Sequence, residues 1–499
     1  MRRYAHIAVL FLLAGRASSQ FYSLPNDFQF NQLCEKVIAR RDSMVHPGMQ
    51  PYIPFFNQRF SSIADSQQVF RYIKQDPAID IFFRDHFLKV RSATEDFTLH
   101  IDPLLNLEAG RDLSDSSSRN FYTNSRGFAA AGAIGKRFYF ETMFAENQSV
   151  FPDYLDERAR QTGVVPGQGR WKGFKSRGFD YAFATGLASI QLWRNVNLQF
   201  GHGKQKVGHG YRSLLLSDNS FNYPFARITQ QWLKGKLRYT NIYASLMNLV
   251  PAATIPTPHT ERLFQKKSAA FQYLEIQPFR SLNIAFFQGV IWQPGNYRNK
   301  QSLTWQYFNP VIYSHLATFG LDHNEHNVLV GTDIIYKLTD RLSVYAQLMA
   351  DRSELGGIQG GLKYFDAFGI KNLTLRAEYT SASRQSYEPQ QGTAYYHYNN
   401  NLAFTPANGS EFILITDYRR NRFFFSSRHH QQSFHSTIRH SGAIHNILAG
   451  YLVNPAYNLN ISIGYTSRRN FYYIGTRERE TNYLYVSLKT SIYNLYYDF

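Results

Sequence analysis

The chain has 499 residues, with 54 Lys and Arg against 36 Asp and Glu, and its formal net charge is +18. The length allows several soluble domains or one large barrel, and a single cysteine excludes an intrachain disulfide. The strongly basic balance points to anionic partners, such as phosphorylated lipid, acidic polysaccharide or nucleic acid.

The N-terminus is typical of a secretory signal peptide over residues 1–19. Two arginines precede an apolar run from Ile7 to Ala14, which is too short to span a bilayer, and Ala17 and Ser19 suit a cut before the next residue. A buried N-terminal helix is the alternative. Removing the three arginines of the signal peptide lowers the formal charge from +18 to +15. Export argues against a nucleic-acid partner, and we find no nucleic-acid-binding motif.

Residues 20–95 differ in pattern from the rest of the chain. The stretches 31–44 and 61–75 have helical spacing, whereas 45–54 (VHPGMQPYIP) is rich in proline and is expected to be extended. We expect a small periplasmic or lumenal segment. It would either plug a barrel or cap its lower rim.

From residue 96 onward, apolar and polar side chains alternate again and again. The stretches 196–201, 342–348, 373–380 and 457–466 all show this period of two. In the last of them the apolar face is formed by Tyr457, Leu459, Ile461, Ile463 and Tyr465. A soluble β-sandwich alternates too, but repetition over some 400 residues favours a membrane barrel with a polar lumen, since closure satisfies every backbone hydrogen bond in lipid.

Turn-forming residues divide these runs. Eight tight connections lie at Gly135-Lys136, Arg194-Asn195, Lys234-Gly235, Pro278-Phe279-Arg280, Thr339-Asp340, Phe368-Gly369-Ile370, Arg420-Asn421 and Asn454-Pro455-Ala456. Long polar connections alternate with them, near 148–178, 205–222, 249–266, 293–325 and 383–410. With one further strand at each end, the turns predict an antiparallel transmembrane β-barrel of about eighteen strands over 96–499. Short turns on one rim and long loops on the other are typical of outer-membrane barrels.

The chain ends in SIYNLYYDF, where Tyr493, Leu495, Tyr497 and Phe499 take alternate positions. This pattern predicts that the closing strand of the barrel runs to the last residue, and its end resembles the C-terminal signal of outer-membrane proteins. Leu484, Val486 and Leu488 have the opposite parity, so we expect a bulge near residues 489 and 490.

The connection 205–228 concentrates side chains that suit an acidic glycan. Aromatic faces stack on sugar rings, and arginine grips a carboxylate or phosphate with two hydrogen bonds. The candidate polysaccharide-binding residues are His209, Tyr211, Arg212, Asp218, Tyr223 and Arg227. The alternative is that this loop folds into the barrel, with Asp218 and Arg212 joining it to the wall. We expect no cofactor and no catalytic residues, because no nucleophile stands in a recognisable catalytic setting. We expect no metal site either, because His323, Glu325 and His326 lack an obvious fourth partner.

Several stretches resemble known barrel families. Gly201–Ile228 resembles the strand–loop–strand core of the Wzi capsule-assembly superfamily, and Trp305–Leu316 resembles its Asn-Pro loop. Val45–Pro54, Leu362–Ser383 and Leu488–Phe499 are similar to hallmarks of the RemB-like gliding-motility proteins of Bacteroidetes. The resemblance implies an eighteen-stranded barrel. For Wzi it implies a surface lectin that holds capsular polysaccharide, and for RemB-like proteins a role in gliding through polysaccharide or adhesion.

The expected function is therefore that of an outer-membrane barrel, not an enzyme, that binds or anchors surface polysaccharide in support of gliding motility, adhesion or capsule attachment. A porin-like channel is one alternative, and an accessory subunit of an outer-membrane secretion or assembly complex is another. Expected partners are outer-membrane lipid and lipopolysaccharide, acidic surface polysaccharide, and other outer-membrane or gliding-machinery proteins.

Overall fold

The structure is a computed structural model. It describes residues 35–36, 38–40, 45–53, 83, 85–92, 94, 96–116, 119–251, 264–293, 305–323, 326–351, 354–383, 386–387, 392–404, 409–434, 440–473, 476–477, 480–490 and 494–499. The predicted signal peptide at 1–19 lies outside these residues, as do most of the two stretches with helical spacing. Among the described residues, no helix is both long enough and apolar enough to span a bilayer.

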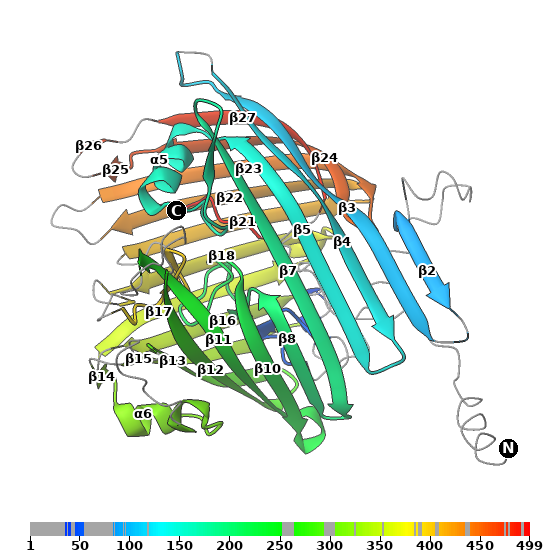
Figure 1. Ribbon diagram of the computed structural model, residues 1–499, viewed down its shortest axis with the longest axis vertical. Coiled ribbons are helices and arrows are strands. Elements are labelled where there is room, and N and C mark those ends of the chain that lie inside the picture. The colour runs from blue at the N-terminus through cyan, green and yellow to red at the C-terminus, as the bar shows by residue number, and fades with distance from the viewer. Residues whose placement is uncertain are drawn as a thin grey trace, which may run out of the picture.

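Eighteen antiparallel strands close into one barrel (Figure 1). They are β3 (Phe97–Asp112), β4 (Asn120–Ile134), β5 (Phe138–Val150), β7 (Gly178–Trp193), β8 (Val196–Gly203), β10 (Tyr223–Trp232), β11 (Leu237–Pro251), β12 (Phe264–Phe279), β13 (Leu282–Trp292), β15 (His326–Lys337), β16 (Leu342–Asp351), β17 (Glu354–Phe365), β18 (Leu373–Ala382), β21 (Gly409–Arg420), β22 (Phe423–Phe434), β23 (His440–Asn454), β24 (Leu459–Arg469) and β27 (Thr481–Lys489). Pairing of β27 with β3 closes the ring. The predicted fold class and strand number are confirmed.

Short elements lie in the connections and inside the ring. The strands are β1 (Met49–Gln50), β2 (Leu88–Ser92), β6 (Lys172–Phe174), β9 (Lys206–Val207), β14 (Asp322–His323), β19 (Tyr396–His397), β20 (Asn400–Asn401), β25 (Tyr472–Tyr473) and β26 (Thr476–Arg477). The helices are α5 (Asp153–Thr162) and α6 (Ser314–Phe319), with single 3-10 turns η3 (Leu233–Gly235), η4 (Trp305–Phe308) and η5 (Ala367–Gly369).

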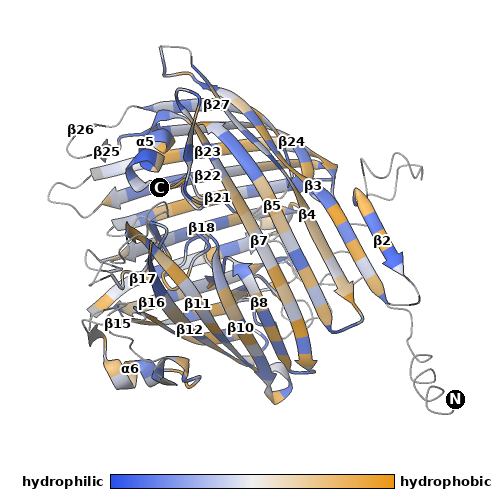
Figure 2. Ribbon diagram, viewed as in Figure 1, coloured by the Kyte–Doolittle hydropathy of each residue, from blue (hydrophilic) through white to orange (hydrophobic). Residues whose placement is uncertain are grey.

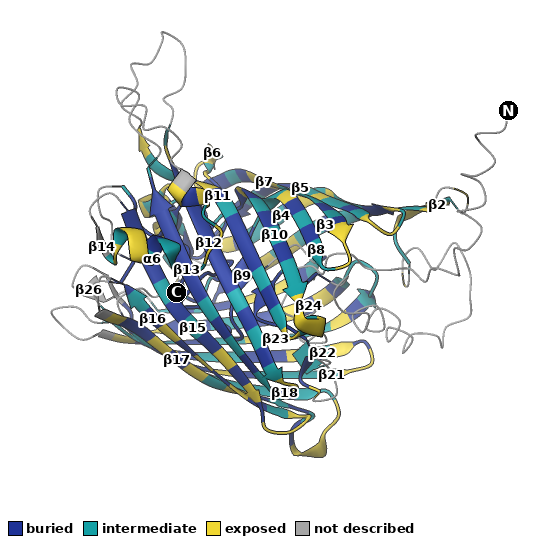
Figure 3. Cartoon of the chain, turned by 90° about the horizontal axis from the view of Figure 1, so that it is seen from below, coloured by how far each residue is buried: buried dark blue, intermediate teal, exposed yellow. Residues whose placement is uncertain are grey.

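The wall has an apolar outer face and a polar inner face, as the alternation predicted. In β24, Ile461 and Ile463 are 56% and 51% exposed, whereas Asn460 and Ser462, which alternate with them, are 1% and 3% exposed. The same banding runs along the strands in Figure 2, and Figure 3 shows alternating exposed and buried positions. An apolar exterior around a polar interior is the arrangement that a barrel needs in lipid.

All eight predicted tight turns lie between consecutive barrel strands, and each of the five predicted long connections lies between two of these turns along the chain. One rim of the barrel therefore carries only tight turns, and we call it the tight-turn rim. The other rim carries the long connections, including α5, α6 and β6. This division follows from the local chemistry of the turns, because Gly and Asn supply the positive φ that a tight reversal requires at Gly135 and Asn421.

The end of the chain corrects the prediction of a continuous closing strand. β27 ends at Lys489, and Thr490 makes the last ladder contacts, to Leu105 at 2.8 and 3.0 Å. Residues 494–499 form no strand. They fold into the lumen, where Asn494, Tyr496 and Asp498 are at most 4% exposed. No bulge continues the strand, because the chain leaves the sheet at the residues where we expected one.

The register of β3 explains why the closing strand β27 stops at Lys489. β3 pairs with β4 along one edge, and on its other edge it pairs with β27 at Asn106–Asp112 and with β2 at Phe97–Ile101. Lys489 faces Asn106, so a longer β27 would place residues 494–498 opposite Ile101–Phe97. β2 already occupies those positions, and the last residues of the chain are therefore left free to turn inward.

Candidate functional site

The predicted glycan loop fills the lumen. Residues 204–222 run between β8 and β10 inside the ring of strands, and the six candidate residues are all at most 3% exposed: His209, Tyr211, Arg212, Asp218, Tyr223 and Arg227. Each is enclosed by protein in this structure. Their assignment as ligand residues stays a prediction, and a glycan would reach them only after the loop had moved.

Arg212 lies at the centre of a buried network of charged and polar groups. Its guanidinium donates two hydrogen bonds to the Glu411 carboxylate of β21, at 2.8 and 3.1 Å. It also contacts Asp498, with 2.6 Å to the backbone oxygen and 3.1 Å to a carboxylate oxygen. His430 of β22 lies 2.9 Å from Glu411 and 3.2 Å from Asp498. The network therefore joins the loop, the wall and the end of the chain.

Two backbone amides fix the loop beside Arg212. The N–H groups of Tyr211 and Arg212 donate to the Glu378 carboxylate of β18, at 2.7 and 3.0 Å. The Tyr345 hydroxyl of β16 donates to the same carboxylate at 2.6 Å. Gly210 precedes this pair, and a side chain there would meet Glu378, so the close approach of backbone to carboxylate requires glycine.

Asp218 holds the C-terminal segment on the other side of the loop. Its carboxylate accepts hydrogen bonds from the Asn494 amide at 3.0 Å and the Tyr496 hydroxyl at 2.6 Å. The Tyr211 hydroxyl in turn donates to Asp498. The predicted joining role of Asp218 and Arg212 is thus present: Arg212 joins the loop to the wall, and Asp218 joins it to the chain end.

The remaining three candidate residues contact other parts of the lumen. His209 lies 3.0 Å from the Asp333 carboxylate of β15. Arg227 donates to the Gln205 side chain at 3.1 Å and to the Pro51 carbonyl at 3.2 Å. The Tyr223 ring packs edge-on against His397, with 5.7 Å between the ring centroids. The structure therefore brings three of the six together around Asp498 and its neighbours and separates the other three.

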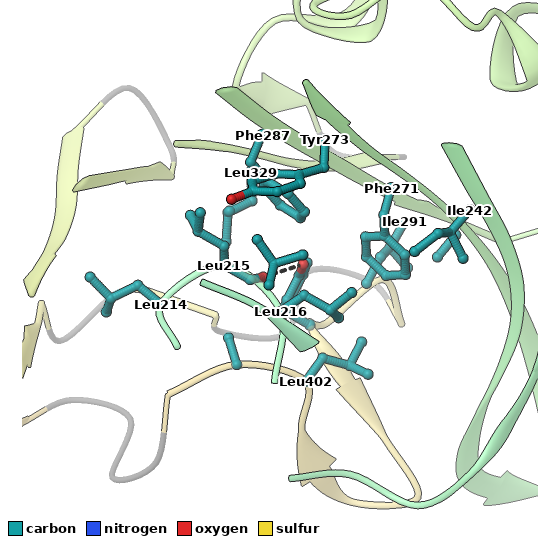
Figure 4. Close-up of a cluster of buried hydrophobic side chains, with 14 of the residues drawn as sticks. Leu214, Leu215, Leu216, Ile242, Phe271, Tyr273, Phe287, Ile291, Leu329 and Leu402 are labelled. Atoms are coloured by element: carbon teal, nitrogen blue, oxygen red, sulfur yellow. Dashed lines mark hydrogen bonds between the residues drawn. The ribbon is translucent and has the colours of Figure 1, made fainter. Parts of the chain in front are cut away.

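An apolar cluster anchors the tip of the loop. Leu214, Leu215 and Leu216 are fully buried among side chains that point inward from the wall, as Figure 4 shows. Residues 386–387 and 392–404 of a second connection cover them, and the Tyr387 and Tyr395 hydroxyls each donate to a backbone carbonyl of the leucine run at 2.7 Å. The sequence analysis missed this second lumenal loop. Its signal was the run of tyrosines from Tyr387 to Tyr398 in an otherwise polar connection.

Residues 45–53 and Glu35, which precede β2, also enter the lumen. β1 pairs with β9 of the loop, and the N–H of Gly48 donates to the Glu275 carboxylate of β12 at 3.1 Å. Glu35 forms ion pairs with Lys363 and Arg376, at 2.8 and 2.5 Å. Parts of the chain that are far apart in sequence thus share the interior.

A cavity of about 280 Å³ remains inside the barrel. Its lining extends from Asn458, in a tight turn, to Pro152 beside α5, and Leu495, Tyr497 and Asp498 of the chain end form part of it. Amides, hydroxyls and tyrosine rings dominate the lining. The cavity therefore offers a narrow polar space that reaches from one rim toward the other.

An exposed basic stretch on the long-connection rim is RWKGFKSR, residues 170–177, which includes β6 (Figure 3). We call it the outer hairpin, because β6 pairs back onto the start of β7. Its four cations, Arg170, Lys172, Lys175 and Arg177, are exposed, and the stretch holds no acidic residue. The Trp171 indole donates to the Ala159 carbonyl of α5 at 2.9 Å, which fixes the hairpin to the helix. Its four cations and two aromatics in eight residues could have been recognised from the sequence.

The Asp498 contacts predict an acid-sensitive chain end. Burial opposes ionisation, but Arg212 and His430 lower the pKa of Asp498 from 3.8 to about 2. Because the folded pKa is the lower one, ionised Asp498 contributes stability above pH 3.8 that is lost as pH falls toward 2. Asp498→Asn should therefore lower the unfolding temperature at pH 6, with the difference from wild type shrinking toward pH 2. A constant difference across this range would contradict the assignment, and Asp156→Asn on exposed α5 is the control.

A closed eighteen-stranded antiparallel barrel with an apolar exterior and a filled polar lumen is a fold of the outer-membrane β-barrel class. No protein-family model and no curated protein matches this sequence. Among solved structures, the chain is similar to Wzi, an outer-membrane protein involved in group 1 capsule assembly in Escherichia coli and a carbohydrate-binding β-barrel. The identity is 14%, the TM-score is 0.55, and the match covers 95% of this chain and 100% of Wzi.

Two further solved structures also match. OpdO of Pseudomonas aeruginosa has 12% identity and a TM-score of 0.44, over 78% of this chain and 96% of its own. OccAB3 of Acinetobacter baumannii has 10% identity and a TM-score of 0.44, over 79% of this chain and 98% of its own. At these identities the comparisons show the fold. The Wzi resemblance noted in the sequence is confirmed at that level, and the RemB-like assignment stays a prediction.

Proposed function

We propose that this protein is an outer-membrane barrel that binds an acidic surface polysaccharide at its long-connection rim, in support of gliding motility, adhesion or capsule attachment. The observation that carries the proposal is the outer hairpin, whose four cations are exposed and have no ion-pair partner within the described part of the chain. Exposed cations beside aromatic rings suit a chain of sugar carboxylates or phosphates. Wzi, which shares the fold, is a carbohydrate-binding barrel.

The filled lumen supports binding over transport. Barrels of this strand number leave an aqueous channel when their interior is empty, but here two loops and both ends of the described chain occupy it with paired charges. One observation favours a porin-like channel as the second candidate, namely the 280 Å³ cavity that reaches along the wall.

Binding of the organism's own surface polysaccharide to the detergent-folded protein tests the proposal. The variant Arg170→Gln, Lys172→Gln, Lys175→Gln, Arg177→Gln is expected to lose most of the binding, and salt should weaken binding by the wild type, because screening acts on exposed charges. The matched control is Lys136→Gln, Arg194→Gln, Arg280→Gln, Lys371→Gln, which removes the same charge from exposed residues of the tight-turn rim.

The control should bind the polysaccharide as well as the wild type. Equal losses in both variants would show only a general attraction of a basic protein for a polyanion. Full binding by the outer-hairpin variant would remove the hairpin from the site, and no binding by the wild type at low salt would favour the channel.

A further inference from the structure

Exposed cations surround the tight-turn rim. Nine of them stand in, or directly beside, seven of the eight tight turns: Lys136, Arg137, Arg194, Lys234, Lys236, Arg280, Arg341, Lys371 and Arg420. The turns joining consecutive strands lie side by side around the ring, so these residues form a discontinuous belt of positive charge rather than one cluster.

Few acids balance this belt. The same turns hold two acidic residues, Asp340 and Asp366, and Asp366 already pairs with Lys36 at 2.7 Å. None of the nine cations lies within ion-pair distance of a carboxylate in the ranges that the structure describes. The belt therefore keeps most of its charge available to a partner outside the chain.

Large aromatic side chains stand next to the cations. Trp193 and Phe279 directly precede Arg194 and Arg280 and are 66% and 67% exposed. Phe368 is 75% exposed in the turn that holds Lys371. Such rings favour the interface between the hydrocarbon and the headgroups of a bilayer, and this places the neighbouring cations at the level of the lipid phosphates.

We propose that the tight-turn rim binds the headgroups of anionic phospholipids in the leaflet that it faces. The cations are spread around the circumference and converge on no pocket, so they cannot enclose one small phosphate ion, whereas an annulus of lipid phosphates matches their arrangement. Basic residues beside a membrane attract anionic lipid by about 1 kcal/mol each at moderate salt. The inference rests on the membrane embedding that we propose, and it is independent of polysaccharide binding at the other rim.

Counting bound lipids by native mass spectrometry tests the inference. The delipidated protein in neutral detergent is titrated separately with phosphatidylglycerol and phosphatidylcholine. Since about 1 kcal/mol per cation corresponds to about fivefold in binding, the wild type should prefer phosphatidylglycerol. The variant Lys136→Gln, Arg194→Gln, Arg280→Gln, Lys371→Gln should lose at least about tenfold of this preference. The outer-hairpin variant should retain it.

Three results would overturn the inference. Equal binding of both lipids by the wild type would leave no role for the charge. Equal losses in the two variants would assign the preference to net charge alone. Displacement of phosphatidylglycerol by millimolar inorganic phosphate would indicate a small-anion site. A protein that keeps its lipid preference but binds no polysaccharide would contradict the proposed function only.

Discussion

Replacement of Arg212 by alanine is expected to destabilise the folded protein by about 3–5 kcal/mol, because it leaves buried carboxylates without their principal cation. Glu411 and Asp498 are 0% and 3% exposed, and Arg212 contacts both. The substitution also removes two contacts, both to Asp498, that hold the chain end in the lumen. The measurement is the midpoint of thermal unfolding in detergent, followed by the gel shift between the folded and unfolded barrel.

Arg160→Ala is the matched control for this experiment. Arg160 pairs with Asp156 at 2.7 Å, but its side chain is 45% exposed, so its loss should cost only about 0–1 kcal/mol. The loss of stability caused by Arg212→Lys should fall between the losses caused by Arg212→Ala and Arg160→Ala. Lysine keeps the charge but cannot bind the carboxylate with two hydrogen bonds. If Arg212→Ala and Arg160→Ala shift the midpoint equally, the buried network does not hold the interior together.

Removal of residues 494–499 is expected to turn a nearly closed barrel into an ion-conducting one. The segment lines the 280 Å³ cavity and fills the space between it and the loop at Arg212 and Asp218. Without it, the cavity joins the surrounding lumen and reaches the width at which barrels of this size conduct. Single-channel recording in planar bilayers should show little current for the wild type and a severalfold larger conductance for the shortened chain.

A second variant keeps this experiment decisive if the shortened chain does not assemble. Tyr496→Gly with Tyr497→Gly preserves the length of the chain and Phe499 while removing two rings from the lumen. Phe279→Gly with Phe368→Gly removes two rings from the exposed tight-turn rim and serves as the control. If the folded variant with Tyr496→Gly and Tyr497→Gly conducts no more than the wild type, the chain end does not obstruct the barrel.

The wall of the barrel could be predicted from the sequence because its determinants are local. Alternation in stretches such as 457–466 reports which side chains face lipid, and Gly or Asn at the reversals fixes where each strand ends. These signals act over two to ten residues. They require no knowledge of the rest of the chain, and they gave the strand number as well as the two kinds of rim.

The contents of the lumen could not be predicted in the same way. Tyr211 and Asp498 are 287 positions apart, and Arg212 and Glu411 are 199 apart. Aromatic, basic and acidic residues that suit a glycan also suit a buried network, and only the partners distinguish the two. The inward turn of residues 494–499 depends on β2, a strand of five residues that lies more than 400 positions earlier in the chain. The outer hairpin was a local signal, and it was overlooked.

The shared edge of β3 has a consequence for how the molecule is put together. Residues 88–92 and residues 494–498 would pair with the same stretch of β3, so only one of them can occupy it at a time. Docking of β2 therefore keeps residues 494–498 out of the sheet and leaves them to pack in the lumen, where Asn494 and Tyr496 contact Asp218. Two segments from opposite ends of the chain thus share one register on β3, and the early one completes this edge of the wall.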